Sequence, residues 1–342
     1  MIDNEGIRAE DTRSCLLCGN EGILLYHGLR DRLFCAPGSW SLLQCPACKL
    51  AWLNPRPIPE DIGKLYFQYF THDLPRDPKG AFAYLRKSIK ASILQSSFGY
   101  QIHGSNRILG SVLSKIAPLN DIAGGDVRYL KASEKGRLLD VGCGNGAFLS
   151  NMKQLGWSVE GIEPDIEALM VARKNLRLNL FQGYLEEAKY PDKYFDAITM
   201  NHVIEHVADP INYLKECLRV LKPGGKLVVI TPNINSLGRN ILNDAWLAWD
   251  PPRHLFLFSI QSLRTSAELA GLTIKELRTT AKGARWIWVS SSLIKRNGIL
   301  KGISPEVPET SLRLQGLVFQ LAECMHQNDS GEELVLIATR DE

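Results

Sequence analysis

The pattern of apolar and polar residues changes near residue 137. From there on, short apolar runs alternate with segments whose apolar residues recur at helical spacing. This alternation is typical of a parallel α/β sheet with connecting helices. We predict strands at 137–141, 158–162, 178–181, 195–200, 226–231, 273–280 and 333–339. We predict helices at 146–155, 165–175, 209–221 and 259–270, and one or two more between 283 and 330, at 285–296 and 309–326.

The first third of the chain has a different texture. Residues 11–56 are rich in Cys, Gly and Pro, with short strand-like runs at 22–26 and 41–44. Residues 62–70 and 81–117 carry apolar residues at helical spacing, interrupted at Gly99–Gly104. We therefore expect a small metal-stabilised module at 1–58, a helical linker or lid at 59–130, and the α/β domain at 131–342.

Composition narrows the classes of partner. The 342 residues hold 40 Lys and Arg against 37 Asp and Glu, a net charge of +3, which is too weak to indicate a nucleic-acid partner. The N-terminus lacks the apolar stretch of a signal peptide, and no uncharged apolar run approaches the length of a membrane span. We therefore expect a cytoplasmic protein.

Four of the eight cysteines form two C-x-x-C pairs, Cys15 with Cys18 and Cys45 with Cys48. In a chain without an export signal, such pairs bind metal more often than they form disulfides. Four thiolates leave no open coordination position, so we predict structural zinc; a redox pair and a vestigial metal site are the alternatives. His27 and Cys35 lie between the pairs and are weaker ligand candidates.

A glycine-rich turn follows the first predicted strand of the α/β domain. Gly142, Gly144 and Gly146 let the backbone turn tightly and approach a ligand, and Glu163 ends the next strand, where a carboxylate can bind ribose hydroxyls. The turn also fits the looser dinucleotide pattern. Asp140 favours another ligand, because an anion at that position repels a pyrophosphate but attracts a cationic amino-acid group.

An ordered set of motifs covers roughly residues 137–340: Leu138–Gly146, Glu163, Phe195–Ile198, His202–Pro210 and Lys222–Gly225. Together they resemble class I S-adenosylmethionine (SAM)-dependent methyltransferases. The resemblance implies a Rossmann-like sheet of seven strands, the last antiparallel, with adenine beside Gly183–Glu186. The cofactor contacts that we infer are Asp140, Gly142, Cys143, Gly144, Asn145, Gly146, Glu163, Pro164, Tyr184, Leu185 and Asn201.

Two histidines and a glutamate follow the fourth predicted strand. His202 or His206 is a candidate general base, with Glu205 orienting an imidazole or a substrate hydroxyl. The same run resembles the ubiquinone-biosynthesis O-methyltransferases, in which this stretch is linked to a divalent metal. His202 stands where that group has an acid, so a second metal near Glu205 and His206 is an open alternative. A further alternative to a catalytic role is that Glu205 and His206 only cap the turn into the following helix.

The segment 246–259 after the fifth strand is aromatic and proline-rich. His254 is a second base candidate, Arg253 a candidate for gripping an anionic substrate group, and Trp249 a substrate contact. A loop packed on the sheet is the alternative. Ser259 is expected to cap the next helix. Asp250-Pro-Pro-Arg resembles the motif of amino-methylating DNA methyltransferases. That motif follows strand four, whereas this segment follows strand five, so the match is accidental.

The stretch after Cys48 is similar to the N-terminal zinc module of methyltransferases that C-methylate sugars and natural products. This resemblance implies substrate contacts from Tyr66 and Tyr69, with core packing as the alternative. Because little sequence follows the sixth strand at 273–280, we do not expect the large C-terminal domain of the sugar enzymes.

We therefore expect methyl transfer to an O or C atom of a small molecule: a carbohydrate, nucleotide-sugar, polyketide or quinone-like acceptor. The alternatives are an rRNA or tRNA methyltransferase whose zinc module binds RNA, and a non-catalytic SAM-binding scaffold. Helices at 81–117 and 285–289 suit a lid, a peripheral membrane contact or a plain solvated face. The sequence leaves the acceptor and the oligomeric state open.

Overall fold

The computed structural model describes residues 2–66, 80–176, 178, 180–300, 310–325 and 329–341. The chain divides into two compact units. The first comprises Met1–Phe70, His202–Leu214 and Val229–Leu336; the second comprises Thr71–Asn201, Lys215–Val228 and Ile337–Glu342. These units cut across the three segments expected from the sequence.

A seven-stranded sheet has the order β13-β14-β11-β10-β7-β8-β9. Its strands are β7 (Arg137–Val141), β8 (Ser158–Glu163), β9 (Leu180–Gln182), β10 (Phe195–Asn201), β11 (Leu221–Pro232), β13 (Thr273–Thr280) and β14 (Glu333–Thr339). The strands β10, β7, β8 and β9 pair in parallel. The last strand, β14, runs antiparallel to β11. The Gly224 amide at the start of β11 donates to the Arg340 carbonyl after β14, and the Asn233 amide after β11 donates to the Glu332 carbonyl before β14. The predicted seven-stranded fold is confirmed.

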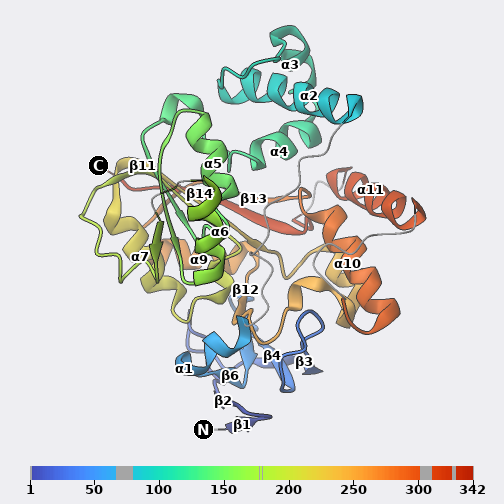
Figure 1. Ribbon diagram of the computed structural model, residues 1–342. Coiled ribbons are helices and arrows are strands. Elements are labelled where there is room, and N and C mark those ends of the chain that lie inside the picture. Colours follow the sequence, from blue (N-terminus) through green and yellow to red (C-terminus); the bar gives the residue numbers. More distant parts are fainter. Residues whose placement is uncertain are drawn as a thin grey trace. The chain divides into compact units, whose positions relative to one another are not determined.

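In the second unit, α5 (Ala147–Gln154) and α6 (Ile166–Leu176) connect the parallel strands and lie along them (Figure 1). Leu149 on α5 and Leu169 and Ala172 on α6 are buried in one apolar cluster with Leu180 of β9. Amphipathic spacing thus fixes which face of each helix meets the sheet. The next helix of the chain is α7 (Pro210–Val220).

Three helices precede the sheet in the second unit: α2 (Ala81–Phe98), α3 (Arg107–Leu113) and α4 (Ala117–Gly125). The expected break falls where α2 ends at Gly99, whose φ of 76° is left-handed. Asn106 then caps α3 by accepting a hydrogen bond from the Leu109 amide. The helices α2 and α3 lie side by side (Figure 1), so close that a Cβ on Gly110 would be 2.1 Å from the Ser92 carbonyl oxygen.

The first unit contains two small sheets. One joins β1 (Ile2–Asn4), β2 (Ile7–Glu10) and β6 (Arg56–Pro57). The other has the order β12-β5-β4-β3 and consists of β3 (Ile23–Leu29), β4 (Trp40–Gln44), β5 (Ala51–Asn54) and β12 (Phe256–Leu257). The strand β12 pairs antiparallel with β5, and the Leu53 amide donates to the Leu255 carbonyl. Residues that follow strand β11 therefore complete the sheet of the cysteine-rich module, which explains why one compact unit holds both.

The other helices of the first unit are α1 (Pro59–Ile62), α8 (Leu237–Leu242), α9 (Ile260–Leu269), α10 (Ala284–Asn297) and α11 (Thr310–Met325). The Ser259 hydroxyl accepts a hydrogen bond from the Ser262 amide at 3.1 Å and caps α9 as predicted. The expected helix at 62–70 appears as α1 and a 3-10 turn over Gly63–Tyr66, and its remainder lies outside the described residues. Among the helices described, none has the length and apolarity needed to cross a bilayer.

Candidate active site and metal sites

The glycine-rich turn joins β7 to α5. Gly142, Gly144 and Gly146 have φ values of 68°, 52° and 74°, a left-handed region that favours glycine. The amides of Gly142 and Cys143 both donate to the Ile162 carbonyl, at 2.8 and 3.0 Å. The turn is therefore held against the end of β8, which places it beside Glu163.

The Glu163 carboxylate is fixed by two backbone amides. The Gly144 amide donates to Oε2 at 2.8 Å, and the Asp165 amide donates to Oε1 at 3.0 Å. An ionised carboxylate has about four lone-pair sites, more than these two amides use. This geometry can accept the two hydroxyls of a ribose and at the same time orient the glycine turn.

Asp140 is the second acid of this site. Its side chain is buried, and the Thr199 hydroxyl donates to Oδ1 at 2.6 Å. Burial raises the pKa of Asp140 to about 7, against the opposing influence of Arg128 and Thr199. A cationic ligand near this carboxylate would favour its ionised form.

The remaining cofactor candidates follow from strand register. Met200 is level with Val141, and Val141 with Ile162, so the ends of β10, β7 and β8 meet at one edge. Asn201 ends β10 at that edge. Cofactors of such sheets bind at the carboxyl ends of the strands. Pro164, Asn145, Tyr184 and Leu185 follow these strands; Leu185 is buried, and the exposed Tyr184 retains surface for a ligand.

Among these candidates, Cys143 is not a reactive thiol. It is buried in the apolar cluster under α5 and α6, and burial raises its pKa well above the usual range. Its backbone, rather than its sulfur, belongs to the site.

His202 lies between two carboxylates of the first unit. Its Nδ1 is 3.2 Å from Glu205 Oε1, and its Nε2 is 2.7 Å from Glu333 Oε1. Burial by itself lowers the pKa of His202, but the hydrogen bonds to both carboxylates outweigh it and raise the pKa to about 10. The imidazole is therefore protonated at neutral pH and does not accept a proton. The expectation that His202 serves as a general base is corrected accordingly.

His206 has the opposite electrostatic environment. Burial and the neighbouring His254 lower its pKa to about 4, so the ring is neutral at pH 7. Its Nδ1 lies 3.0 Å from the Arg253 carbonyl, and His254 Nδ1 lies 2.8 Å from the Ala248 carbonyl. A carbonyl only accepts, so each Nδ1 carries a hydrogen, and the neutral ring of His206 has its lone pair on Nε2.

Glu205 lies in one cluster with the imidazoles of His206 and His254. The carboxylate is fully buried, and the Thr231 hydroxyl donates to its Oε2 at 2.9 Å. Burial raises the pKa of Glu205, but His202 outweighs this and lowers it to about 2. One ligand atom each from Glu205, His206 and His254 lie within 4.8 Å of one another. Two imidazoles and a carboxylate are a donor set that suits a divalent cation.

Arg253 does not have the predicted environment. Its guanidinium is buried and donates to Asp31 at 2.8 and 2.9 Å and to Asp250. Both carboxylates and the Leu65 carbonyl occupy its donors. The expectation that Arg253 grips an anionic substrate group is therefore corrected: it stabilises the loop that carries His254.

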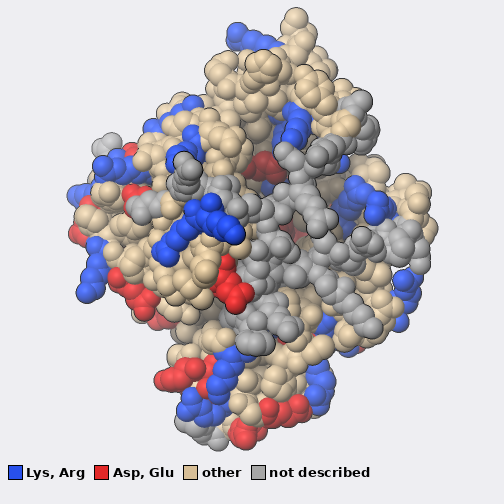
Figure 2. All heavy atoms as spheres, in the orientation of Figure 1, with Lys and Arg blue, Asp and Glu red and all other residues tan. Residues whose placement is uncertain are grey.

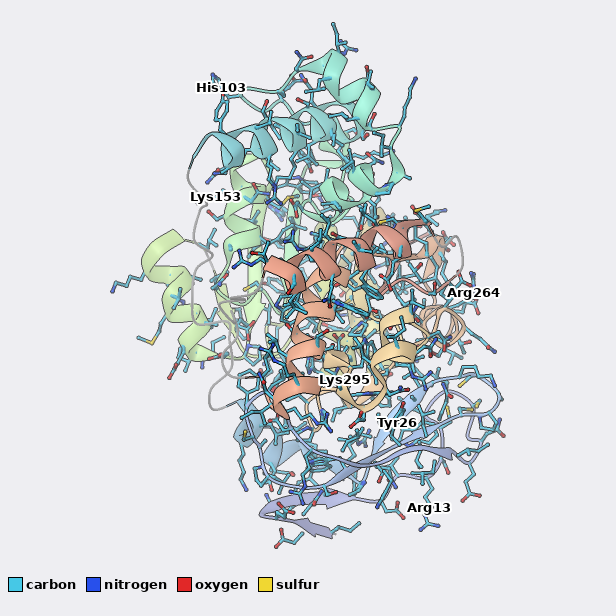
Figure 3. The ribbon with its side chains drawn as sticks, turned by 90° about the vertical axis from the view of Figure 1, so that its right-hand side faces the viewer. Arg13, Tyr26, His103, Lys153, Arg264 and Lys295 are labelled. Carbon is cyan, nitrogen blue, oxygen red and sulfur yellow. The ribbon has the colours of Figure 1, made fainter. Side chains whose placement is uncertain are left out.

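Trp249 is also a packing residue in this structure. It is buried, its Nε1 donates to the Asn243 carbonyl, and its ring lies 4.6 Å from that of Tyr26. Figure 3 places Tyr26 on the sheet of the cysteine-rich module. The substrate contact expected from Trp249 stays a prediction. Tyr69 and the side chain of Tyr66 lie outside the described residues.

The four cysteines of the two C-x-x-C pairs meet as predicted. Sγ–Sγ distances are 3.4 Å for Cys15–Cys48, 3.3 Å for Cys18–Cys45 and 3.9 Å for Cys18–Cys48. A tetrahedron with Zn–S bonds of about 2.3 Å has edges of about 3.8 Å, so the cluster fits zinc with a small adjustment. His27 bonds Ser41 instead, and Cys35 is exposed and not part of the four-cysteine group.

Sequence reasoning missed Glu333, Thr231 and Asp31. Each contacts a candidate residue from a distant part of the chain: Glu333 is 131 positions from His202, and Asp31 is 222 positions from Arg253. No local motif marks them. The start of an antiparallel last strand was the only available signal for Glu333.

Comparison with known proteins agrees with this fold. Residues 119–277 match the family described as "Methyltransferase domain". A ubiquinone biosynthesis O-methyltransferase of Klebsiella pneumoniae is 37% identical over 106 residues, covering 29% of this chain and 43% of that protein. The one of Alkalilimnicola ehrlichii is 38% identical over 128 residues, covering 34% and 52%. The chain thus spans about half the length of the curated relatives that it matches.

One solved structure with a similar arrangement is a SAM-dependent methyltransferase from Archaeoglobus fulgidus. It is 18% identical and has a TM-score of 0.44, with coverage of 72% of this chain and 98% of that chain.

Proposed function

Because residues 119–277 of this chain are a class I SAM-dependent methyltransferase domain, we propose that the protein transfers the methyl group of SAM to an oxygen of a small-molecule acceptor. The observation that carries the proposal is the pair of acids flanking the glycine turn, with Glu163 held by the Gly144 amide at 2.8 Å. Bound SAM supplies an activated, electrophilic methyl group. The protein must bind and align the two reactants and remove a proton from the acceptor.

In this proposal the two acids bind opposite ends of the cofactor. Glu163 accepts the ribose hydroxyls, and its orientation is fixed in advance by two backbone amides. Asp140 attracts the cationic amino-acid end, because a nearby positive charge favours the ionised form of this buried carboxylate. The left-handed glycines allow the backbone to approach the ligand without a Cβ in between.

Proton removal falls to His206 or His254. In both rings Nδ1 is hydrogen-bonded to a backbone carbonyl, so Nε2 is the atom that can take up the proton, and the low pKa of His206 keeps that ring neutral. After proton transfer, the buried anion of Glu205 stabilises the new imidazolium charge. An oxygen acceptor is favoured over carbon because the curated relatives are O-methyltransferases.

The same three residues support a second role for this cluster. Metal-binding histidines usually donate their second ring N–H to a carbonyl or carboxylate, as His206 and His254 do here. Glu205, His206 and His254 would hold the divalent cation, which would lower the pKa of a bound acceptor hydroxyl. In that case the imidazoles orient the cation and do not act as bases.

The proposed acceptor is a small molecule that carries a hydroxyl group. Carbohydrate, nucleotide-sugar, polyketide and quinone-like hydroxyl compounds all fit a small-molecule O-methyltransferase. The cytoplasm is the proposed compartment.

A labelled-methyl assay tests the proposal. The protein is incubated with methyl-labelled SAM and a panel of hydroxylated compounds from these classes, and label is followed into the acceptor fraction. We expect label on oxygen with at least one class. Calorimetry with SAM and with nicotinamide dinucleotides runs in parallel. Binding of the dinucleotide in place of SAM would overturn the proposal.

A further inference from the structure

The stretch 80–120 differs in charge from the rest of the chain. It contains five basic residues and no aspartate or glutamate, whereas the whole chain has 40 basic and 37 acidic residues. The basic residues are Arg86, Lys87, Lys90, Arg107 and Lys115, and all five side chains are exposed. Lys90 also pairs with Asp126 at 2.7 Å. The helices α2 and α3 and the turn after α3 therefore carry exposed basic side chains and no acidic residue of their own.

Large apolar side chains are exposed on the same helices. These residues are Tyr84, Leu85, Ile108, Leu109, Val112 and Ile116. Ile108 is 79% exposed and Val112 is 59% exposed, far from the burial usual for aliphatic side chains. We call the exposed residues of 84–116 the α2–α3 surface. On the face seen in Figure 2, this region has basic and uncharged atoms and no acidic ones among the described residues.

Helix packing explains why these side chains point outward. Gly110 is the contact of α3 with Ser92 of α2. At about 100° per residue, Ile108 and Val112 lie some 160° around the helix from Gly110, on the side away from α2. Closer packing of α2 with α3 therefore cannot bury them.

We propose that the α2–α3 surface docks on an anionic phospholipid membrane. Aliphatic side chains enter the boundary between headgroups and acyl chains, and lysine and arginine pair with the anionic headgroups. A second copy of this chain is disfavoured, because a twofold interface would place two positive surfaces against each other. Single-stranded nucleic acid would call for aromatic stacking, and the surface offers mainly aliphatic side chains.

Vesicle flotation of the full chain tests the proposal. Vesicles of phosphatidylcholine alone are compared with vesicles that also contain phosphatidylglycerol. We expect clear binding only with phosphatidylglycerol, and loss of binding as salt is raised. At about one factor of five per basic residue, Arg107→Glu with Lys115→Glu should weaken partitioning by tenfold or more. Ile108→Glu with Val112→Glu should weaken it similarly.

The matched control is Arg264→Glu with Lys295→Glu. Arg264 on α9 and Lys295 on α10 are exposed and lie outside the α2–α3 surface (Figure 3). This variant changes the net charge equally and should bind vesicles within about twofold of wild type. Circular dichroism and SAM calorimetry verify that every variant is folded.

Four outcomes with vesicles or in thermal melts would overturn the proposal, and RNA binding is a fifth. They are equal binding to neutral vesicles, equal losses in the control variant, unchanged binding of both surface variants, and a large loss of thermal stability in Ile108→Glu with Val112→Glu. The last would mean that the face is packed inside this chain. Retention of mixed-sequence RNA at salt that abolishes vesicle binding would assign the surface to nucleic acid instead.

Discussion

Asp31 in the cysteine-rich module accepts two hydrogen bonds from the guanidinium of Arg253, at 2.8 and 2.9 Å, and both side chains are fully buried. The Leu33, Phe34 and Ala36 amides hold the Asp31 carboxylate in place. Arg253 in turn offers its carbonyl to His206 and precedes His254. The position of both imidazoles therefore depends on a residue of the module.

We expect Asp31→Asn to damage both stability and turnover. Arg253 keeps Asp250 as its counter-ion, but asparagine has only one acceptor oxygen, so one of the two buried N–H groups that Asp31 accepts loses its partner, which costs about 1–3 kcal/mol. Thermal melting should show the loss, and SAM affinity by calorimetry should change little. Glu5→Gln is the matched control, since Glu5 pairs with Arg30 on the surface and such pairs contribute about 0–1 kcal/mol. Equal effects of the two variants would contradict the assigned role of Asp31.

Zinc should be bound at one ion per chain, and native mass spectrometry measures it. Removing the metal, or Cys45→Ser, should lower the melting temperature by several degrees, because the four thiolates tie the turn between β4 and β5 to the preceding segment. Since β5 pairs with β12, turnover should fall as well. Cys35→Ser should leave metal content unchanged. A protein that carries no zinc and melts normally would disprove the zinc site.

Glu163→Gln should weaken SAM binding by tenfold to a hundredfold. Hydrogen bonds to a charged group contribute about 1.5–3 kcal/mol, and the amide group loses both the charge and one acceptor. Isothermal calorimetry gives the affinity directly. Glu268→Gln, on an exposed acid of α9, serves as the control. Unchanged affinity for Glu163→Gln would refute the ribose contact.

SAM affinity should depend on pH through Asp140. Burial raises its pKa to about 7, so the carboxylate is increasingly protonated as the pH falls below that value. A cationic ligand prefers the ionised form, and affinity should therefore drop from pH 8 to pH 5.5. Calorimetry across this range is the measurement. Asp140→Asn should bind weakly at every pH, and a slope that survives this substitution would assign the titration to another group.

His206→Ala and His254→Ala should lower turnover by about 100-fold or more and change SAM affinity less than threefold, as expected for groups that act on the acceptor. If the residues hold a cation instead, both variants should also lose bound divalent metal in elemental analysis. Because the pKa of His206 is about 4, turnover of the base mechanism should be flat from pH 6 to 8 apart from SAM binding. His103→Ala, in the loop between α2 and α3, is the control.

Glu323→Gln should stabilise the protein above pH 7. Glu323 is buried beside Glu332, and burial raises the pKa of Glu323 well above that of an unfolded chain. The folded state then holds a proton that the unfolded state releases, so the free energy of unfolding falls as pH rises above about 4.5. Urea melts at pH 5 and pH 8 should show a smaller difference in the variant than in wild type.

Local sequence determined much of this protein. The periodicity of apolar residues predicted the strands β7, β13 and β14 with their bounds. It could do so because the side chains that a strand or helix buries recur at a fixed spacing along the sequence. The glycines of the turn and the two C-x-x-C pairs could be recognised because each meets a local backbone or coordination requirement.

Only the tertiary structure decided how the candidate side chains are used. In the sequence alone, His202, His206 and Arg253 are equally good candidates. In the structure, two carboxylates keep His202 protonated and burial keeps His206 neutral. Asp31 and Asp250 occupy the donors of Arg253. Protonation and access depend on groups brought together from across the chain, and electrostatic energy follows distance in space, which spacing along the sequence does not specify.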